Sequence, residues 1–208
     1  STPIKSSAAS DVYKRQTINM MIHYFEDEGC DIFLAAPTGR AAKRMTEATG
    51  FEAKTIHRLL ELNGGTSDED RNASFERNDL NPLEADVIII DEMSMVDSCL
   101  FEAVLRAISV TCKLVLVGDS DQLPSVGAGN VLKDIIDSGV MSVVTLKEIF
   151  RQAQESEIVM NAHKIVNGEH IDLASKDKDF FFMQRLEYGE LQDLVVELCK
   201  TRLPKAYD

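Results

Sequence analysis

Residues 86–97, DVIIIDEMSMVD, place two adjacent acids, Asp91 and Glu92, directly after an unbroken apolar run. The run at residues 87–90 is β-branched throughout and short for a helix, which is typical of a strand buried on both faces of a parallel sheet. Ligands of open parallel sheets bind beyond the carboxyl ends of the strands. We therefore expect Asp91 to hold Mg²⁺, directly or through water, and Glu92 to deprotonate a water that attacks a γ-phosphate. The alternative is that these acids only cap the following helix.

A second apolar run ends in the same way. Residues 114–130 read LVLVGDSDQLPSVGAGN, and their polar cluster contains Gly118, Asp119, Asp121 and Gln122. Gln122 is uncharged and can donate and accept hydrogen bonds at once, which suits sensing a terminal phosphate or an attacking water. The alternative is an ordinary Asx-rich turn.

Strand-like and helical patterns alternate through the first 150 residues. We expect strands at residues 31–36, 86–91, 112–119 and 140–146, and helices at residues 17–28, 38–50, 55–62, 100–108 and 130–139. Thr38 is expected to cap one helix and Gly50 to end it. Residues 64–81 are polar and predict a mobile surface excursion. The alternation favours an α/β fold with a mostly parallel sheet flanked by helices.

Two helices have apolar faces that we expect to point inward. The faces consist of Leu100, Phe101, Val104, Leu105 and Ile108 in one helix and Ile158, Val159, Ala162, Ile165 and Val166 in the other, at residues 156–168. A strand at residues 179–184 and an amphipathic helix at residues 191–204 should follow. These elements after residue 151 are too few for a complete second domain.

Composition limits the class of protein. The 208 residues are 44% hydrophobic and 27% charged, which is typical of a globular domain with one sizeable core. The formal net charge of -13 argues against a protein that is basic all over, so any nucleic-acid site must be local. The four cysteines are widely spaced and predict reduced thiols. Because the chain has neither a signal-peptide pattern nor a membrane-spanning run, we expect a cytoplasmic protein that does not bind membranes.

Five motifs together resemble a known family. They are LAAPTGRAAKRM, KTIHRLL, DEMSMVD, GDSDQLPSVGAGNVL and EIFRQAQESEIVMNAH. In this order and with these gaps they are similar to the first motor domain of RecD-like superfamily 1 DNA helicases, of the exodeoxyribonuclease V alpha-subunit type, over residues 17–208. The resemblance implies a RecA-like P-loop NTPase fold, with ATP and Mg²⁺ as cofactors. It also implies movement along single-stranded DNA in repair or recombination.

The resemblance assigns roles to the residues at the strand ends. Asp91 would serve Mg²⁺ and Glu92 would be the catalytic base. Gln122 with Asp119, next to Gly118, would bind nucleotide and couple its state to DNA. Arg151 matches the family arginine that reaches toward the γ-phosphate, where a guanidinium offsets developing charge. The alternative for Arg151 is a surface arginine before a helix.

The motifs APTGRAAKRM and KTIHRLL resemble the family's contacts to single-stranded DNA. The expected contacts are Pro37, Thr38, Gly39, Arg40, Lys43, Arg44, Thr55, His57 and Arg58. Residues 40–58 hold five basic and two acidic side chains, a local excess of three positive charges that suits a phosphate-tracking patch. The start of a helix at Thr38 could add uncharged phosphate contacts. The alternative is a solvated helix face.

The chain departs from the family at its start. A Gly-rich P-loop ending in Gly-Lys-Thr should precede the helix at Thr17, but the sequence there is SSAASDVYKRQT. Lys14 falls at the lysine position, while Tyr13 replaces the glycine and Arg15 the Mg²⁺-binding hydroxyl. We interpret residues 1–16 as a foreign or disordered leader, residues 17–150 as an incomplete first motor domain, and residues 151–208 as a linker and the start of a second. The fragment would then bind ATP poorly.

Two rival functions remain open. A different P-loop ATPase, such as a partitioning or transport motor, would also use a strand-end aspartate but has no reason to combine GDSDQLPSV with EIFRQ. A non-catalytic single-stranded nucleic-acid-binding or scaffold module is compatible with the missing P-loop. The resemblance also allows partner subunits of a nuclease-helicase complex and implies 5′ to 3′ movement.

Overall fold

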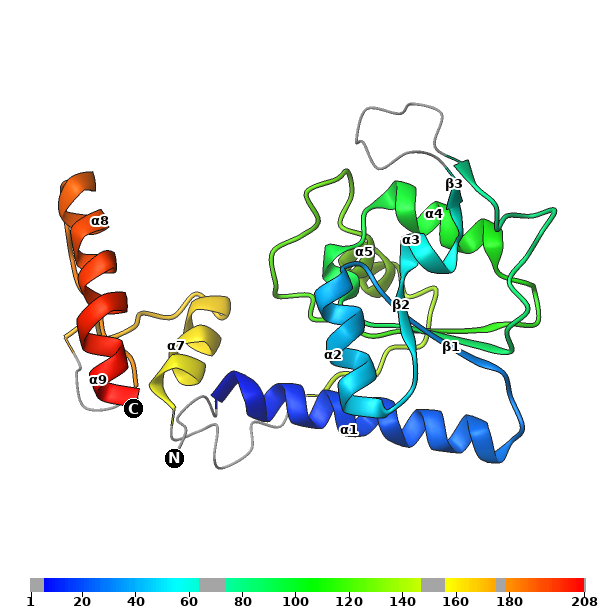
Figure 1. The fold of residues 1–208 in the computed structure, drawn as a ribbon, viewed down its shortest axis with the longest axis horizontal. Coiled ribbons are helices and arrows are strands. Elements are labelled where there is room, and N and C mark those ends of the chain that lie inside the picture. Colours follow the sequence, from blue (N-terminus) through cyan, green and yellow to red (C-terminus); the bar gives the residue numbers. More distant parts are fainter. Residues whose placement is uncertain (1–5, 64–73, 147–155, 175–178, 208) are drawn as a thin grey trace. The chain divides into compact units, whose positions relative to one another are not determined.

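Four parallel strands, in the order β2-β1-β5-β6, form the main sheet of the protein (Figure 1). A computed structural model describes residues 6–63, 74–146, 156–174 and 179–207. The chain divides into two compact units, Arg15–Leu146 and Ser1–Lys14 with Lys147–Asp208, and the sheet belongs to the first of these.

Three of the four strands of the sheet follow apolar runs of the sequence, whereas β2, with the sequence AKT, does not. Its strands are β1 (Ile32–Ala36), β2 (Ala53–Thr55), β5 (Val87–Ile90) and β6 (Lys113–Leu116). β5 lies between β1 and β6 and is fully enclosed, with all four side chains 0% exposed. A strand covered on both faces needs a continuous apolar run, because its side chains alternate between the two faces. The predicted parallel α/β sheet is confirmed.

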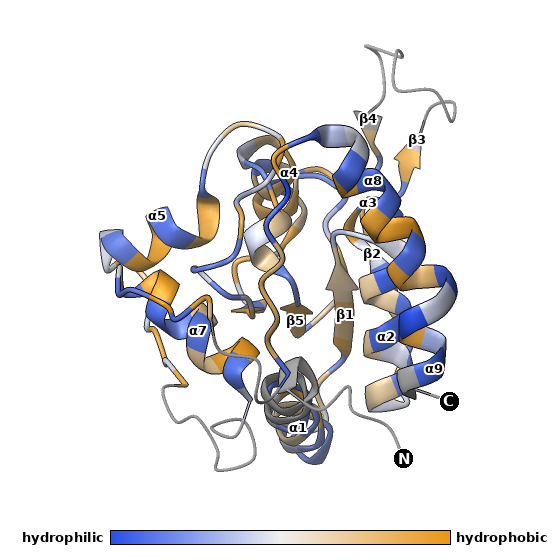
Figure 2. Ribbon diagram, turned by 90° about the vertical axis from the view of Figure 1, so that its left-hand side faces the viewer, coloured by the Kyte–Doolittle hydropathy of each residue, from blue (hydrophilic) through white to orange (hydrophobic). Residues whose placement is uncertain are grey.

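Helices bury the two faces of this sheet in separate clusters. On one face Ile18 and Ile22 of α1 (Ser6–Asp27) pack with Val87 and Ile89. On the other, Ile88 and Ile90 belong to a cluster that α3, α4 and α5 complete. The bounds of the remaining helices of this unit are α2 (Gly39–Thr49), α3 (Ile56–Leu59), η1 (Met93–Met95), α4 (Ser98–Ala107) and α5 (Val131–Ser138). Figure 2 shows hydrophobic colour along β1 and β5 and mixed colour on the surrounding helices.

Helix ends agree with the sequence at several points. Thr38 caps α2 and Gly50, with φ +77°, ends it, as expected. The backbone at Gly50 has the left-handed conformation that glycine adopts at low cost. α1, however, begins at Ser6 rather than at Thr17. Residues 6–16 of the expected leader are therefore part of this helix.

Three expectations in this unit are wrong. The helix expected at residues 55–62 ends at Leu59, because Leu62–Asn63 (β3) pairs with Ser74–Phe75 (β4) as an antiparallel hairpin. Residues 140–146 form no strand, and in the described chain they have no ladder partner. Leu105 is 47% exposed although Val104 beside it is buried, because Val104 packs in the core cluster and Leu105 does not.

The second unit consists mainly of helices. They are α7 (Glu157–Val166), α8 (Tyr188–Glu197), the π-helical turn η2 (Leu198–Arg202) and α9 (Leu203–Tyr207). The predicted inward face of α7 is wrong at four of its five residues, which are exposed, namely Ile158, Ala162, Ile165 and Val166. The strand expected at residues 179–184 is also absent, since these described residues pair with no other strand. An apolar face predicts burial only where another surface covers it.

Candidate functional site

The strand ends bring the two acidic clusters of the sequence side by side. Val117 N donates to Ile90 O over 2.8 Å, and Met93 N donates back to Val117 O over 3.0 Å. Neighbouring strands of a sheet lie about 4.8 Å apart, so the chain after β5 and the chain after β6 emerge together. The structure therefore places the segment of Asp91 and Glu92 next to the segment that leads to Gln122.

Asp91 and Glu92 directly follow the last residue of β5. Both are half-buried, and Glu92 N donates to Asp91 Oδ1 over 2.7 Å. Glu92 has φ +57°, a left-handed backbone that costs a non-glycine residue roughly 1–3 kcal/mol. Such strain persists only where the surrounding structure imposes it, and it gathers at functional sites.

The cap of the next α-helix is a different acid. Asp97 Oδ1 accepts from Leu100 N over 2.8 Å at the start of α4, whereas Glu92 makes no side-chain cap bond to η1. The α4 cap is therefore Asp97, and Glu92 does not cap η1 through its side chain.

Ser94 is a polar residue of this corner that sequence reasoning missed. It is 6% exposed, and its Oγ has no hydrogen-bond partner in the part of the chain that the structure describes. A buried hydroxyl without a partner costs about 1–3 kcal/mol. A single serine between two methionines gave no sequence signal, because its burial depends on the conformation of η1 in the folded protein.

The donor set suits a magnesium ion that is shared with a nucleotide. No group of three or more His, Cys, Asp or Glu side chains with metal-binding geometry occurs among the described residues. Mg²⁺ keeps several waters and usually takes one or two protein carboxylates together with phosphate oxygens. Asp91, with Glu92 and the unpaired Ser94 hydroxyl nearby in sequence, fits that pattern better than an all-protein metal site.

The Gln122 loop begins with a tight turn. Asp119 accepts from Asp121 N over 3.0 Å and from Gln122 Nε2 over 3.4 Å. The Asx turn that was the alternative interpretation of this segment is thus present. It follows β6, where the functional interpretation also expects Gln122. Gly118 has a packing reason for its identity, because a Cβ there would lie 2.8 Å from Leu132 Cδ2 and 3.1 Å from Met93 N.

The expected DNA contacts gather at the ends of β1 and β2, on the other side of β5 from the Gln122 loop. Ala36 and Thr55 are register partners in these strands. Thr38 caps α2 by accepting from Ala41 N, and Thr55 caps α3 by accepting from Arg58 N, each over 3.2 Å. The whole predicted set therefore surrounds two adjacent helix starts, namely Pro37, Thr38, Gly39, Arg40, Lys43, Arg44, Thr55, His57 and Arg58.

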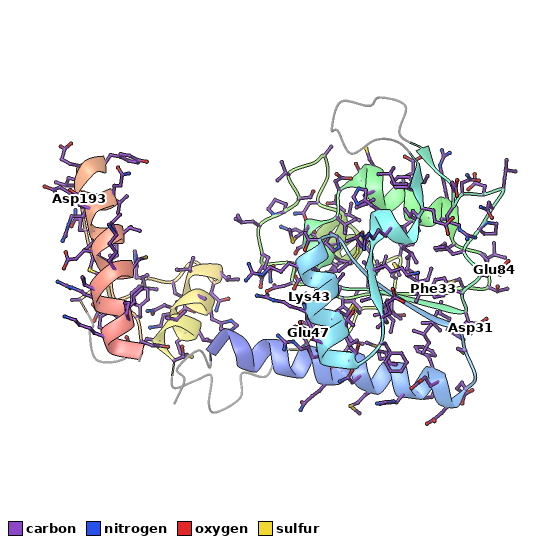
Figure 3. The ribbon with its side chains drawn as sticks, in the orientation of Figure 1. Asp31, Phe33, Lys43, Glu47, Glu84 and Asp193 are labelled. Carbon is purple, nitrogen blue, oxygen red and sulfur yellow. The ribbon has the colours of Figure 1, made fainter. Side chains whose placement is uncertain are left out.

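The basic side chains of this group are accessible. Arg40, Lys43, Arg44 and Arg58 are exposed, and Lys43 pairs with Glu47 over 3.8 Å along α2 (Figure 3). An exposed pair of this kind contributes little to stability and can exchange its acid for a phosphate. His57 lies 6.0 Å from the Phe75 ring, which adds an aromatic pair beside α3.

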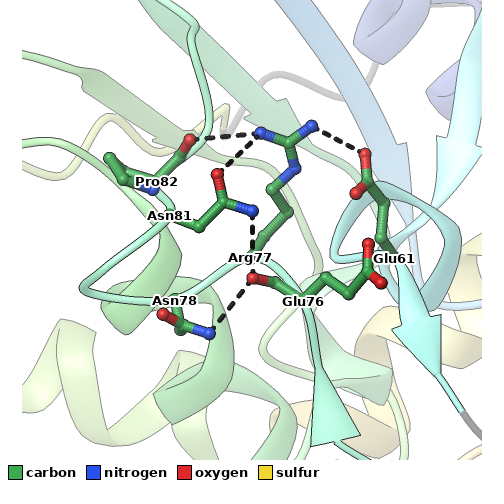
Figure 4. Close-up of polar contacts among 6 residues, drawn as sticks. All are labelled: Glu61, Glu76, Arg77, Asn78, Asn81 and Pro82. Carbon is green, nitrogen blue, oxygen red and sulfur yellow. Dashed lines mark hydrogen bonds and ion pairs between the residues drawn. The ribbon is translucent and has the colours of Figure 1, made fainter.

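An ion-pair cluster fixes the hairpin next to α3 (Figure 4). Arg77 Nη2 donates to Glu61 Oε1 over 2.8 Å, and Arg77 Nη1 donates to Pro82 O over 3.4 Å. The hydrogen bond from Arg77 lowers the pKa of Glu61, and the same bond raises the pKa of Arg77. Sequence reasoning treated residues 64–81 as a mobile excursion, but the described residues 74–81 are tied down by this cluster and by hydrogen bonds of Asn78 and Asn81.

The roles of two predicted nucleotide residues stay predictions. Arg151 lies outside the described residues. Lys14 lies within α1 and is grouped with the second compact unit, so its role remains a prediction. Residues 6–16 are helical, and amides inside a helix bond to the helix itself rather than to a phosphate. The described leader therefore does not fit a P-loop.

Comparison with known proteins identifies the class of this domain. A family model described as AAA domain matches residues 12–181. The chain belongs to the AAA domain family. This membership agrees with the RecA-like α/β class expected from the sequence.

Individual relatives are more specific. The chain is 36% identical to the ATP-dependent RecD2 DNA helicase of Deinococcus radiodurans, over 75% of this chain and 20% of the relative. It is 36% identical to the RecBCD enzyme subunit RecD of Mycolicibacterium smegmatis, over 70% of this chain and 30% of the relative. A crystal structure of Bacteroides sp Pif1 in complex with ADP-AlF4 is 27% identical over 57% of this chain and 29% of that chain, with a TM-score of 0.37. The expected resemblance to RecD-like helicases is confirmed, and the chain spans less than a third of these relatives.

No helix among the described residues is long and apolar enough to cross a membrane.

Proposed function

We propose that this chain is the first motor domain of a longer ATP-dependent DNA helicase that moves along single-stranded DNA in repair or recombination. The observation that carries the proposal is the pair Asp91 and Glu92 at the end of the buried β5, with strained backbone at Glu92, beside the loop of Gln122. The similarity to the ATP-dependent RecD2 DNA helicase of Deinococcus radiodurans supports the same activity. We expect the protein to be located in the cytoplasm.

Each residue at the strand ends would have one task. Asp91 would hold Mg²⁺, which supplies charge neutralisation for the phosphates when it is bound. Glu92 would accept the proton of the attacking water, and its left-handed backbone would aim its carboxylate away from that of Asp91. Gln122 would orient the water or report the terminal phosphate, while Arg151 would offset charge that develops on the transferred group.

The DNA-binding part of the proposal rests on the positions of the helix starts. β1 and β2 lead to the basic residues, and β5 and β6 lead to the acids and Gln122. One sheet would thus hold the DNA contacts and the nucleotide contacts on adjacent strands, and a change at the nucleotide could reach the DNA through β1 and β5.

The test of catalysis uses the full-length protein that carries this domain. Glu92→Gln should lower ATP hydrolysis stimulated by single-stranded DNA by at least about 100-fold, the lower range for loss of a general base. Glu102→Gln is the matched control, because Glu102 is an exposed acid on α4 that pairs only with Arg106 among the described contacts. DNA-stimulated hydrolysis that survives in the Glu92→Gln variant would show that the assignment of Glu92 is wrong.

A non-catalytic single-stranded DNA-binding module is the second candidate, and the helical, glycine-poor leader favours it. DNA binding without any ATP turnover in the full-length protein would establish this candidate. Arg44→Ala in the 208-residue chain should weaken binding to an oligonucleotide and reduce its salt dependence by about one phosphate contact. Arg106→Ala, on α4, should change neither.

Partner subunits are part of the proposal only through the RecD relative, which is a subunit of the RecBCD enzyme. Gel filtration of the full-length protein from its own cells would show whether it co-elutes with a nuclease.

A further inference from the structure

Gly127 lies against Asp97 with no room for a side chain. A Cβ on Gly127 would be 2.2 Å from Asp97 Oδ2 and 2.7 Å from Asp97 Cβ. The Asp97 side chain cannot rotate away from Gly127 without breaking the helix cap, because its Oδ1 accepts from Leu100 N at the start of α4. The φ angle of Gly127 is outside the left-handed region, so the contact rather than the backbone conformation requires glycine here.

The backbone beside this contact is bonded as well. Ser98 N, the first amide of α4, donates to Ala128 O over 2.9 Å. The Ser125 hydroxyl ties the loop to itself by bonding to Gly127 O over 3.1 Å and to Gly129 O over 3.2 Å. The far end of the loop is therefore shaped to present one carbonyl and one bare glycine to the helix start.

The chain that follows β5 and the chain that follows β6 are also joined close to the sheet, by the hydrogen bond from Met93 N to Val117 O. The segment from Glu92 to Asp97 is short and turns through η1, with Met95 N bonded to Glu92 O. The loop that contains Gln122 is thus fixed at both ends to the segment that begins with Asp91 and Glu92.

We propose that Gly127 and Asp97 are positioning residues that latch the loop of residues 119–130 onto the start of α4 and so fix Gln122 relative to Asp91 and Glu92. Neither residue is one of the proposed catalytic residues. The consequence for turnover rests on the proposed helicase function, whereas the latch itself does not. A methyl group at Gly127 would push the loop off the helix start and displace Gln122.

The first measurement tests the latch in the 208-residue chain by amide exchange resolved by residue. In the Gly127→Ala variant the amide of Ser98 should exchange at least about 10-fold faster, because its only described acceptor is Ala128 O. The amide of Met93, at the near end of the loop, should keep its rate. Gly189→Ala is the control, since a Cβ there meets nothing within 4 Å. Unchanged exchange at Ser98 would overturn the latch.

The second measurement asks whether space is the cause. Asp97→Gly removes the atoms that a Cβ on residue 127 would meet, and glycine is an acceptable N-cap residue. The double variant Asp97→Gly with Gly127→Ala should therefore return the Ser98 rate to within about threefold of the Asp97→Gly value. A double variant that exchanges as fast as Gly127→Ala would overturn the steric explanation. Ser125→Ala, which leaves the contact with Asp97 intact, should loosen the loop to a smaller degree.

The third measurement reads the effect on catalysis in the full-length protein. Gly127→Ala should lower DNA-stimulated kcat by roughly 10-fold to 100-fold, because small misplacements of reacting groups have effects of this size. The KM for ATP should change much less, and the double variant should regain most of the rate. If Gly127→Ala frees the Ser98 amide but leaves kcat unchanged, the positioning role is overturned. If the unmodified protein lacks DNA-stimulated turnover, the proposed function fails while the exchange data still decide the latch.

Discussion

The strand β5 and the helix α7 are both rich in branched apolar side chains, but only β5 is enclosed. All four side chains of β5 are 0% exposed, whereas Ile165 of α7 is 60% exposed. The enclosed residues of α7 and its cap are polar instead, namely Asn161 and Ser156. An apolar pattern thus indicates the type of secondary structure, whereas burial depends on whether another element packs against that pattern.

The start of α7 is held by a carboxylate rather than by a core. Asp179 Oδ1 accepts from Glu157 N over 2.7 Å and from Ile158 N over 3.3 Å, and its Oδ2 accepts from the Ser156 hydroxyl. Burial acts to raise the pKa of Asp179, but these hydrogen bonds outweigh it and hold the pKa below its ordinary value. The start of α7 should therefore lose stability as pH falls and Asp179 becomes protonated.

The largest effect is expected in β5. Ile89→Ala should lower the free energy of unfolding of the sheet unit by roughly 2–5 kcal/mol, because the side chain is fully buried in the cluster that contains Ile18 and Ile22 of α1. Urea unfolding, followed through amide signals of the sheet, measures the loss. A loss below about 0.5 kcal/mol, the size usual for surface changes, would contradict the enclosure of β5.

A smaller effect is expected at Asp179. Asp179→Asn should destabilise α7 by about 1 kcal/mol, the usual size for a helix cap, and leave the sheet signals unchanged. Because the pKa is lowered in the folded state, the cap contributes fully above the unfolded pKa of about 3.9 and is lost as pH falls through the folded value. NMR signals of α7 during an acid titration should show this loss in the unmodified chain but not in Asp179→Asn. An identical titration of both proteins would refute the cap.

The smallest effect is expected on the exposed face of α7. Ile165→Ser should change the stability of α7 by no more than about 0.5 kcal/mol, since the side chain is 60% exposed and loses few contacts. The same NMR signals followed in urea provide the measurement. A loss as large as that of Ile89→Ala would show that α7 buries this face after all.

Sequence reasoning found β1, β5 and β6 because their signals are local, but it predicted no strand at Ala53–Thr55, where β2 forms. The run at residues 87–90, the cap at Thr38 and the terminator at Gly50 each act within a few residues, so they survive in any tertiary context. It failed for the hairpin of β3 and β4, since pairing between Leu62 and Phe75 joins residues that are distant in the chain. It also failed for residues 140–146, where β-branched residues alone could not supply a neighbouring strand.

The candidate site divides in the same way. Adjacent acids after a buried strand, and a Gln-containing turn after another, were readable because parallel strands end at one edge of a sheet. The unpaired hydroxyl of Ser94, the contact of Gly127 with Asp97 and the clamp of Arg77 on Glu61 were not readable, because each depends on segments that meet only after folding.

The sequence by itself determined the parallel α/β class, the family and the chemical types of residue at the strand ends, because periodicity, caps and motifs are properties of short stretches of chain. Only the tertiary structure decided which strands are neighbours, that Glu92 has a left-handed backbone, and that the Gln122 loop is fastened to the start of α4. These features arise from steric fit and hydrogen bonds between separate segments, and no local pattern encodes the distance between two such segments.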